Sequence, residues 1–492
     1  MVYAALKRLT QHSVIYALGP AVHKALGFVL LPFVTLWIGS TGNYGVLEIG
    51  SVTIAIAAQV LGINLLHGMS RFHGQYATEK ERGTLVSTTL ALLVATTGTA
   101  LGLAWIFRGP AAELVFESRE YAPALVAVFA ILFFQSIGQV GLRWLQILER
   151  SVTYGIVTTV KLLLEIGLKV WLLVLGLEYM GAFYSVLGCE ALAAVVLIVV
   201  LVRKVGLSFS MPMARRLIAY SAPLIVSGLC MFVLHQADRF FVQHLRGEGE
   251  VGLYGLAYKL GAIGNTVFLE AFGLIWFPYV FALTSHEEVV LLSRKVLTYF
   301  NLVMCVASLA LALFAREIVV AMSAPEFHDA WPALPIVALG YLFWALFQVV
   351  STVFYLRERT GAISLLVAAA ALLNLGLNAL LVPRLGFQGA AWSTVGTFAA
   401  LAVATWIAAE RLMPIRYEIG RILIPIGTAG LLFAAGCVLP EMPFPAVIAA
   451  KLGLVLALPV VLAVTGFLDR EEKAKIKEIL GSLGRTRGRG SD

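Results

Sequence analysis

Three charged residues within one apolar stretch, Lys161, Glu165 and Lys169, have a spacing that could bind an anion. They fall at i, i+4 and i+8, which places all three side chains on one stripe of a helix. One carboxylate between two ammonium groups leaves an excess of positive charge facing one direction. The stripe could form an anion-binding wall with a carboxylate that titrates, or an ion network in a seam between packed helices. The sequence leaves both interpretations open.

A further cation, Lys24, lies well inside the first apolar run, beside His23 and just after Gly19-Pro20. Proline removes a backbone hydrogen bond and kinks a helix. A kinked helix with a buried cation would suit a moving gate that binds a diphosphate. The alternative is that Lys24 extends along its helix to the cytoplasmic interface.

Other ionisable side chains in apolar runs are also functional candidates, because charges inside a membrane are costly. Glu190 and Glu270 could be proton sites, since a buried carboxylate holds its proton more readily; a hydrogen bond to a neighbouring helix would equally explain them. Asp238 and Arg239 are adjacent and point about 100° apart on a helix. We therefore expect each to find a partner on another helix, as a structural or gating pair, and not to pair with the other.

Three charged residues are expected to lie at membrane surfaces, without a functional role. Lys259 and Lys451 lie near the ends of apolar runs and should reach the interface, and Glu48 should lie at the periplasmic surface. The four cysteines all fall within apolar runs and have no metal-ligand or disulfide spacing, so they are predicted to pack as small apolar residues. With no Walker A sequence, no HExxH and no carboxylate pair in a loop, we predict no catalytic residue, metal or cofactor, and no enzyme.

The composition explains where these charges must lie. The 492 residues are 60% hydrophobic and 13% charged, whereas soluble proteins carry roughly 25% charged residues. Apolar runs of this length predict membrane-spanning helices, because only helices and closed barrels satisfy the backbone in lipid and barrel strands are shorter. About fourteen are predicted, at residues 14–38, 46–66, 84–107, 121–142, 155–175, 181–202, 218–242, 252–282, 296–315, 332–356, 361–382, 389–408, 421–439 and 446–468.

The distribution of lysine and arginine predicts the orientation of these helices. With the N-terminus in the cytoplasm, the 36 lysines and arginines divide into 18 on inside connections, 7 in the tail, 5 on outside connections and 6 within helices. This excess follows the positive-inside rule. Both termini are therefore predicted to be cytoplasmic, and the net charge of +8 needs no nucleic acid to explain it.

The chain also resembles itself at a separation of 208 to 210 residues. The matching segments are Lys7-Arg8-Leu9 with Arg215-Arg216-Leu217, Tyr44-Gly45 with Tyr254-Gly255, Pro123 with Pro332, Glu149-Arg150-Ser151 with Glu358-Arg359-Thr360, and Gly181-Ala182 with Gly389-Ala390. The separation covers six predicted helices, so both copies insert with the same orientation. Parallel repeats are related by an axis along the membrane normal, and substrate sites lie at their interface.

The predicted fold is therefore an all-α polytopic membrane protein built from two parallel six-helix bundles and two additional helices. The first bundle comprises residues 1–205 and the second 206–410. Two further spanning helices occupy residues 411–468, and residues 469–492 form a charged cytoplasmic tail.

Several segments resemble the oligosaccharide flippases of the MOP superfamily, which also contains MATE drug exporters and lipid II flippases. The segments that carry the resemblance are His12-Ser13 through Gly27-Phe28, Leu31-Pro32, Tyr44-Gly45, Arg71-Phe72, Ser221-Ala222-Pro223, Ala237-Asp238-Arg239-Phe240 and Gly252-Leu253-Tyr254. The resemblance covers essentially the whole chain. It implies two six-helix bundles around a central cavity that opens alternately to the two sides of the membrane.

The resemblance also implies a substrate, an undecaprenyl-diphosphate-linked oligosaccharide moved across the inner membrane for surface polysaccharide biosynthesis. Lys24, Lys161 and Lys169 would then bind the anionic headgroup, while Glu165, Glu190, Asp238, Arg239 and Glu270 would serve coupling or gating. The implied partners are the lipid-linked oligosaccharide, the lipid bilayer and, as a candidate, the polysaccharide polymerase machinery. Alternatives are a MATE-like cation-coupled drug exporter, which needs an acidic cavity, a lipid II flippase, and a polymerase or ligase, which usually has a large periplasmic loop.

Overall fold

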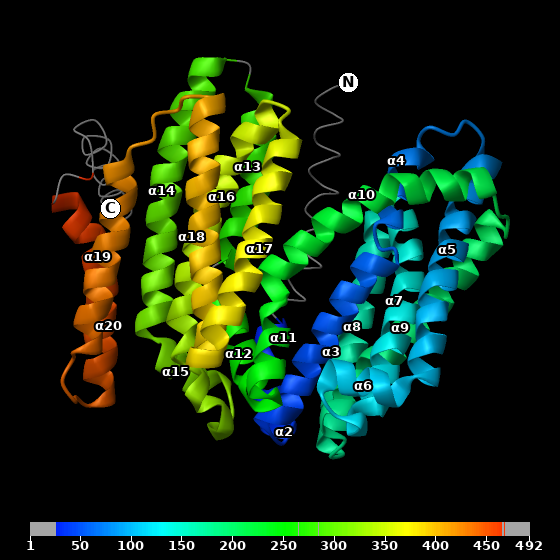
Figure 1. The fold of residues 1–492 in the computed structure, drawn as a ribbon, viewed down its shortest axis with the longest axis horizontal. Helices are drawn as coiled ribbons and strands as arrows, with labels where there is room; N and C mark the ends of the chain where they lie inside the picture. The colour runs from blue at the N-terminus through cyan, green and yellow to red at the C-terminus, as the bar shows by residue number, and fades with distance from the viewer. Residues whose placement is uncertain (1–25, 264, 284, 465–466, 468–492) are drawn as a thin grey trace, which may run out of the picture. The chain divides into compact units, whose positions relative to one another are not determined.

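The computed structural model describes residues 26–263, 265–283, 285–464 and 467, and every regular element within them is helical (Figure 1). The helices up to residue 205 are α2 (Leu31–Trp37), α3 (Thr41–Leu61), α4 (Leu65–His73), α5 (Glu79–Ile106), α6 (Arg108–Phe116), η1 (Arg119–Tyr121), α7 (Ala122–Ile147), α8 (Ser151–Val174) and α9 (Glu178–Val205). Those after it are α10 (Met211–Gln236), α11 (Asp238–Arg246), α12 (Glu248–Gly261), η2 (Asn265–Leu269), α13 (Glu270–Ala282), α14 (His286–Leu313), α15 (Ala315–Met322), η3 (Pro325–Ala330), α16 (Ala333–Leu356), α17 (Thr360–Leu385), α18 (Phe387–Leu412), α19 (Ile419–Cys437) and α20 (Phe444–Val464).

Eleven of the described helices are long and apolar enough to cross a membrane, and each coincides with one of the fourteen predicted runs. The other three runs differ for identifiable reasons. The run at 155–175 forms α8, whose three charged residues reduce its apolar character. The run at 252–282 is divided into α12, η2 and α13, and the run at 14–38 begins outside the described residues. The all-α membrane architecture is confirmed, whereas the count of fourteen stays a prediction.

Local sequence signals account for where several helices begin. Ser40 caps α3, because its hydroxyl accepts a hydrogen bond from the backbone N–H of Asn43 at 3.1 Å. Thr78 and Glu81 form a capping box at the start of α5, in which each side chain accepts from the backbone N–H of the other. Both arrangements satisfy N–H groups that a helix leaves unpaired at its first turn.

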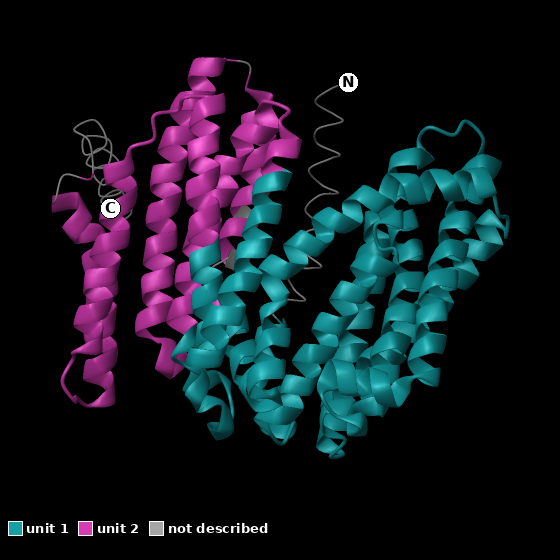
Figure 2. Cartoon of the chain, in the orientation of Figure 1, with its two compact units in different colours: residues 1–259, 319–333, 364–397 teal, residues 260–318, 334–363, 398–492 magenta. Residues whose placement is uncertain are grey.

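The chain forms two compact units, which Figure 2 distinguishes by colour. Unit 1 comprises residues 1–259, 319–333 and 364–397, and unit 2 comprises residues 260–318, 334–363 and 398–492. Unit 1 extends past residue 205 because α10 packs against the first half of the chain: the Ser221 hydroxyl donates to the Asn64 carbonyl at 3.1 Å. The predicted division at residue 205 stays a prediction, and the predicted tail at 469–492 lies outside the described residues.

Close packing of small residues holds the first bundle together within unit 1. Helix α7 packs between α5 and α9, and a methyl group added at Gly141 would lie only 2.7 Å from the side chain of Leu197. Gly138 faces Ala194 on the same pair of helices, at an ordinary contact distance of 3.8 Å for an added methyl group. Small residues let helix backbones approach closely where lipid provides no hydrophobic driving force. The α7–α9 contact is therefore the main packing contact of this bundle.

A second close contact in unit 1 joins the two sequence repeats, at the crossing of α3 and α12. A methyl group added at Gly45 would lie 2.0 Å from the carbonyl oxygen of Glu248, the first residue of α12. One added at Gly252 would lie 2.0 Å from the carbonyl oxygen of Thr41, the first residue of α3. Both contacts join the N-terminal end of α3 to the N-terminal end of α12, so the backbones of the two helices touch there.

Unit 2 attaches the last two helices to α14 and α15 through polar contacts. The Asn301 side chain donates to the Ile422 carbonyl at 3.0 Å, and Lys451 Nζ lies 2.5 Å from Glu317 Oε1. The expectation that Lys451 reaches the interface is therefore wrong: only 13% of its side chain is exposed. A cation in the middle of α20 is retained because Glu317 neutralises it.

We predict that Gly252→Ala destabilises the protein by roughly 1–3 kcal/mol or more, the usual cost of forcing additional atoms into a packed contact. The obstructing atom is a backbone carbonyl, which cannot move aside as a side chain can. The free energy of unfolding in mixed micelles measures the effect. Gly249→Ala is the matched control on the same helix, since its added methyl would meet only the Thr41 hydroxyl at 3.5 Å. Equal stability of the two variants would contradict the close crossing.

Candidate functional site

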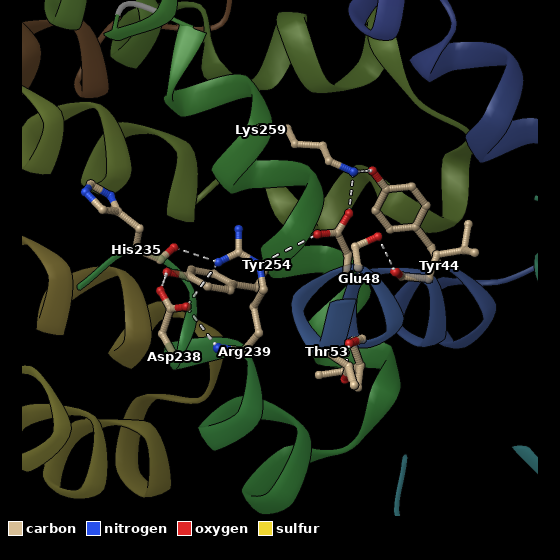
Figure 3. A network of polar contacts seen from close by, with 11 residues as sticks. Tyr44, Glu48, Thr53, His235, Asp238, Arg239, Tyr254 and Lys259 are labelled. Atoms are coloured by element: carbon tan, nitrogen blue, oxygen red, sulfur yellow. Dashed lines mark hydrogen bonds and ion pairs between the residues drawn. The ribbon is translucent and has the colours of Figure 1, made fainter. Parts of the chain in front are cut away.

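The α3–α12 crossing carries a network of four charged side chains, two acidic and two basic (Figure 3). Glu48 of α3 lies between the cations: Lys259 of α12 donates to its Oε1, and Arg239 Nε of α11 lies 3.6 Å from its Oε2. Lys259 also donates to the Tyr44 hydroxyl at 2.8 Å. The charges sum to zero with Asp238 included, so the network is electrically balanced.

Asp238 and Arg239 contact each other, and the expectation that they do not is wrong. Arg239 Nη1 lies 3.1 Å from Asp238 Oδ1, and the backbone N–H of Arg239 donates to the same oxygen. The 100° argument fails because it considers only where each side chain leaves the helix: the long side chain of Arg239 bends back to Asp238, the first residue of α11. The carboxylate thus lies at a helix N-terminus, which favours a negative charge.

Both residues also have the partners on other helices that the sequence led us to expect. The hydroxyl of Tyr254 on α12 donates to Asp238 Oδ2. The guanidinium of Arg239 lies over the ring of Tyr258, 4.4 Å from its centroid, and donates to the His235 carbonyl at 3.1 Å. Side-chain exposures of 2% for Asp238 and 6% for Arg239 show that both charges are fully enclosed. A buried charge is tolerated only when it is paired in this manner.

Glu48 and Lys259 were predicted to lie at membrane surfaces, and for Glu48 this is wrong, since only 7% of its side chain is exposed. The side chain of Lys259 is 47% exposed, but its ammonium group donates to Tyr44 and Glu48. These hydrogen bonds direct it to α3 and not to a membrane interface. One signal in the sequence could have indicated the contact. A methyl group at Gly255 would lie 2.5 Å from the Glu48 side chain, so the repeated Tyr-Gly pair marks the position at which α12 makes room for the carboxylate.

Hydrogen bonds fasten α17 and α18 to the same part of unit 1. The backbone N–H of Phe387, the first residue of α18, donates to Glu250 Oε2 on α12 at 2.9 Å. Buried Asn374 on α17 donates to the Thr397 hydroxyl on α18 at 3.2 Å. Hydrogen bonds between membrane helices are worth on the order of 1 kcal/mol each. Together they connect α12 to both helices, so the charged network lies within a larger polar framework.

The charged stripe on α8 has a further ion-pair partner on another helix, Glu190, which its spacing in the sequence could not reveal. Lys169 pairs with Glu165 at 3.0 Å on its own helix, as its i+4 spacing allows, whereas Lys161 pairs with Glu190 of α9 at 2.7 Å. The expected excess of positive charge is therefore wrong, because two carboxylates match two lysines. These contacts favour the interpretation as a seam between packed helices. Headgroup binding by Lys161 and Lys169 stays a prediction.

Two further predicted site residues cannot be placed in the same detail. Lys24 lies outside the described residues. Glu270 is the first residue of α13, and its side chain is outside the described part of the structure. Their proposed roles as headgroup and coupling residues stay predictions.

The histidines beside Arg71 on the connection between α3 and α5 add no charge. Partial burial lowers the pKa of His67, and the nearby Arg143 lowers it further. Partial burial also lowers the pKa of His73, with Arg82 adding to the effect. Since the ordinary pKa of histidine is about 6.5, both rings are neutral at pH 7. Arg71 is then the one permanent charge of the three.

Comparison with known proteins identifies the family of this chain. Residues 9–284, more than half of the chain, match the family model described as "Polysaccharide biosynthesis protein". The chain belongs to the polysaccharide biosynthesis protein family. A curated relative, the uncharacterized membrane protein YabM of Bacillus subtilis (strain 168), is 24% identical over 201 residues, which span 39% of this chain and only 37% of that relative.

The fold of this polysaccharide biosynthesis family member is similar to the folds of a solved flippase and a solved transporter. The structure titled "Lipid II flippase MurJ, inward closed conformation" matches with a TM-score of 0.68 at 10% identity, covering 91% of this chain and 98% of that one. A multidrug resistance MATE family transporter of the MOP superfamily, in an inward-facing conformation, matches with a TM-score of 0.58 at 17% identity, covering 80% and 99%. At these identities the likeness shows the fold alone.

We predict that Tyr254→Phe destabilises the protein by roughly 1.5–3 kcal/mol, the value of a hydrogen bond to a charged group. The substitution keeps the ring and leaves one oxygen of buried Asp238 without its donor. The free energy of unfolding in mixed micelles checks the effect, with Tyr184→Phe as the control because that side chain is exposed. Should both variants unfold alike, the hydroxyl would not be supporting the carboxylate.

Proposed function

We propose that this protein flips an undecaprenyl-diphosphate-linked oligosaccharide across the inner membrane, by alternating access, for the biosynthesis of a surface polysaccharide such as O-antigen, capsule or exopolysaccharide. One observation carries the proposal: a member of a polysaccharide biosynthesis family has its two sequence repeats joined at a close crossing that also carries a balanced set of paired charges. The crossing provides a contact that can open, and the family supplies the class of cargo.

The charges argue for an anionic cargo over a cationic drug. Glu48, Asp238, Glu165 and Glu190 each have a lysine or arginine partner among the described residues. None of these four carboxylates is therefore available to attract a cation, as a MATE-like exporter would require. A cation that is only half-buried can still attract an anion, because its exposed side is open to a second partner.

Lys259 is the described cation that best fits a diphosphate headgroup. Its side chain is 47% exposed, compared with 19% for Lys161, 23% for Lys169 and 6% for Arg239. It also lies at the interface of the repeats, where parallel-repeat transporters bind their substrates. We propose that Lys259 contacts the headgroup and that Lys24, predicted from the sequence, acts with it.

The proposed orientation makes the crossing an outer gate. Thr41 and Glu248 begin α3 and α12 directly after the short links at residues 38–40 and 247, which the distribution of lysine and arginine predicts to be periplasmic. The contact between α3 and α12 would then close the periplasmic end. Opening it would require the repeats to separate at Gly45 and Gly252, which breaks the charge pairs around Glu48.

We predict that Lys259→Ala reduces surface polysaccharide export at least about tenfold, since losing a charge-assisted contact costs roughly 1.5–3 kcal/mol and 1.4 kcal/mol is tenfold. Export is measured in a strain that lacks the chromosomal gene and carries the variant, together with the amount of lipid-linked oligosaccharide that accumulates. Lys80→Ala, a change at an exposed lysine, is the control. Lys161→Ala serves as a comparison, since a seam residue should affect stability more than export.

Two results would count against the proposal at different levels. Normal surface polysaccharide in the strain without the gene would exclude the flippase function under those conditions. Full export by Lys259→Ala, with the deletion strain defective, would leave the function intact and exclude Lys259 as a headgroup contact.

We predict that a cysteine introduced by His244→Cys reacts with an impermeant thiol reagent in intact cells, and one introduced by Lys80→Cys reacts only after lysis. Both changes are made in a background without the four native cysteines. The side chain of His244 is 82% exposed, so lack of access would not explain a negative result. The reverse labelling pattern would overturn the orientation.

A further inference from the structure

The Glu48 network contains a buried donor that makes no hydrogen bond. Arg239 Nε has no hydrogen-bond partner. Only 6% of the Arg239 side chain is exposed, so this donor is buried. An unpaired buried donor normally costs stability, so its presence needs an explanation. The nearest charged partner is Glu48 Oε2, 3.6 Å away, which is within ion-pair range and too far for a hydrogen bond.

Glu48 is held away from this donor by its other partner. Lys259 draws Glu48 Oε1 into a hydrogen bond on the opposite side of the carboxylate. Arg239 Nη1 is engaged elsewhere, because it contacts Asp238 Oδ1 and the His235 carbonyl, both at 3.1 Å. If Lys259 left, a shift of less than 1 Å would bring Glu48 within ordinary hydrogen-bond distance of Arg239 Nε, where such bonds are roughly 2.7–3.2 Å long.

We propose that Glu48 exchanges partners, from Lys259 to Arg239, when Lys259 binds the phosphate groups of a lipid-linked substrate. Arg239 is a positioning residue in this exchange: it takes over the carboxylate and never touches the ligand. The exchange rests on the proposed function, because it concerns the headgroup contact assigned to Lys259. Without Arg239, releasing Lys259 would strand a buried carboxylate, and substrate binding would carry that cost.

The charge balance supports this order of events. Arg239 serves Asp238 and can serve Glu48, while Lys259 keeps nearly half of its side chain open to a ligand. After the exchange, both carboxylates share Arg239, Tyr254 still donates to Asp238, and Lys259 faces the phosphates. Each of the two buried carboxylates therefore retains a partner before and after substrate binding.

Binding of farnesyl diphosphate to the purified full-length protein in nanodiscs tests the exchange, with farnesol as the uncharged control. Glu48→Gln should raise the affinity on the order of tenfold, because Lys259 is no longer held by a carboxylate. Arg239→Lys should lower it several-fold, since lysine keeps a charge beside Asp238 and lacks the Nε donor. In the Glu48→Gln background, Arg239→Lys should have no further effect, as expected for residues that act through one another.

The double-mutant comparison separates this role from a structural one. An equal loss of affinity from Arg239→Lys in both backgrounds would show that Arg239 acts on the fold or on the ligand directly, and it would overturn the exchange. A lower affinity in Glu48→Gln would overturn it as well. Absence of farnesyl diphosphate binding in the unaltered protein would instead exclude the headgroup role of Lys259, and the exchange with it.

Discussion

The sharing of one carboxylate by two cations across the α3–α12 crossing is the interaction on which the rest of unit 1 depends. Glu48 can reach both Lys259 and Arg239 only because α3 and α12 approach closely at Gly45 and Gly252, where no side chain separates their backbones. In a medium of low dielectric, two cations this close would repel strongly without an anion between them. The glycines and the carboxylate therefore depend on each other: the glycines allow the short distance between the helices that the ion pairs of Glu48 require.

Duplication of the chain explains the crossing, and divergence explains its charge. Tyr44 and Tyr254 are equivalent at a separation of 210 residues, yet Tyr44 accepts from Lys259 while Tyr254 donates to Asp238. At the same separation Glu48 corresponds to Tyr258, and Lys259 corresponds to Ile49. Each repeat thus supplies a charge that the other lacks. The ion pair therefore joins non-equivalent positions of the two repeats, and divergence has left each of its charges in one copy only.

The membrane helices could be predicted from sequence because their cause is local. An apolar run of sufficient length has one stable solution in lipid, and the eleven described spans follow such runs. The pair Glu165 and Lys169 was accessible for the same reason, being four residues apart. Glu48 and Lys259 are separated by 211 residues, and Glu190 meets Lys161 from another helix. No rule of spacing identifies such partners, since they depend on which helices pack together. The contact of Asp238 with Arg239 also escapes a spacing rule, because the long arginine side chain bends back to its neighbour at the start of α11.

A contact that opens and closes repeatedly is easier to separate when its buried carboxylate has two alternative cationic partners. A fully satisfied buried pair is costly to separate, because each ion would lose its only partner. Glu48 has one partner that is half-exposed and another with a donor to spare, so the carboxylate has two arrangements that differ by the movement of a few atoms. Two packings of similar energy are what a switching element requires. The unsatisfied donor of Arg239 is then the feature that keeps the second arrangement accessible, and a network with every hydrogen bond made would hold the crossing in a single state.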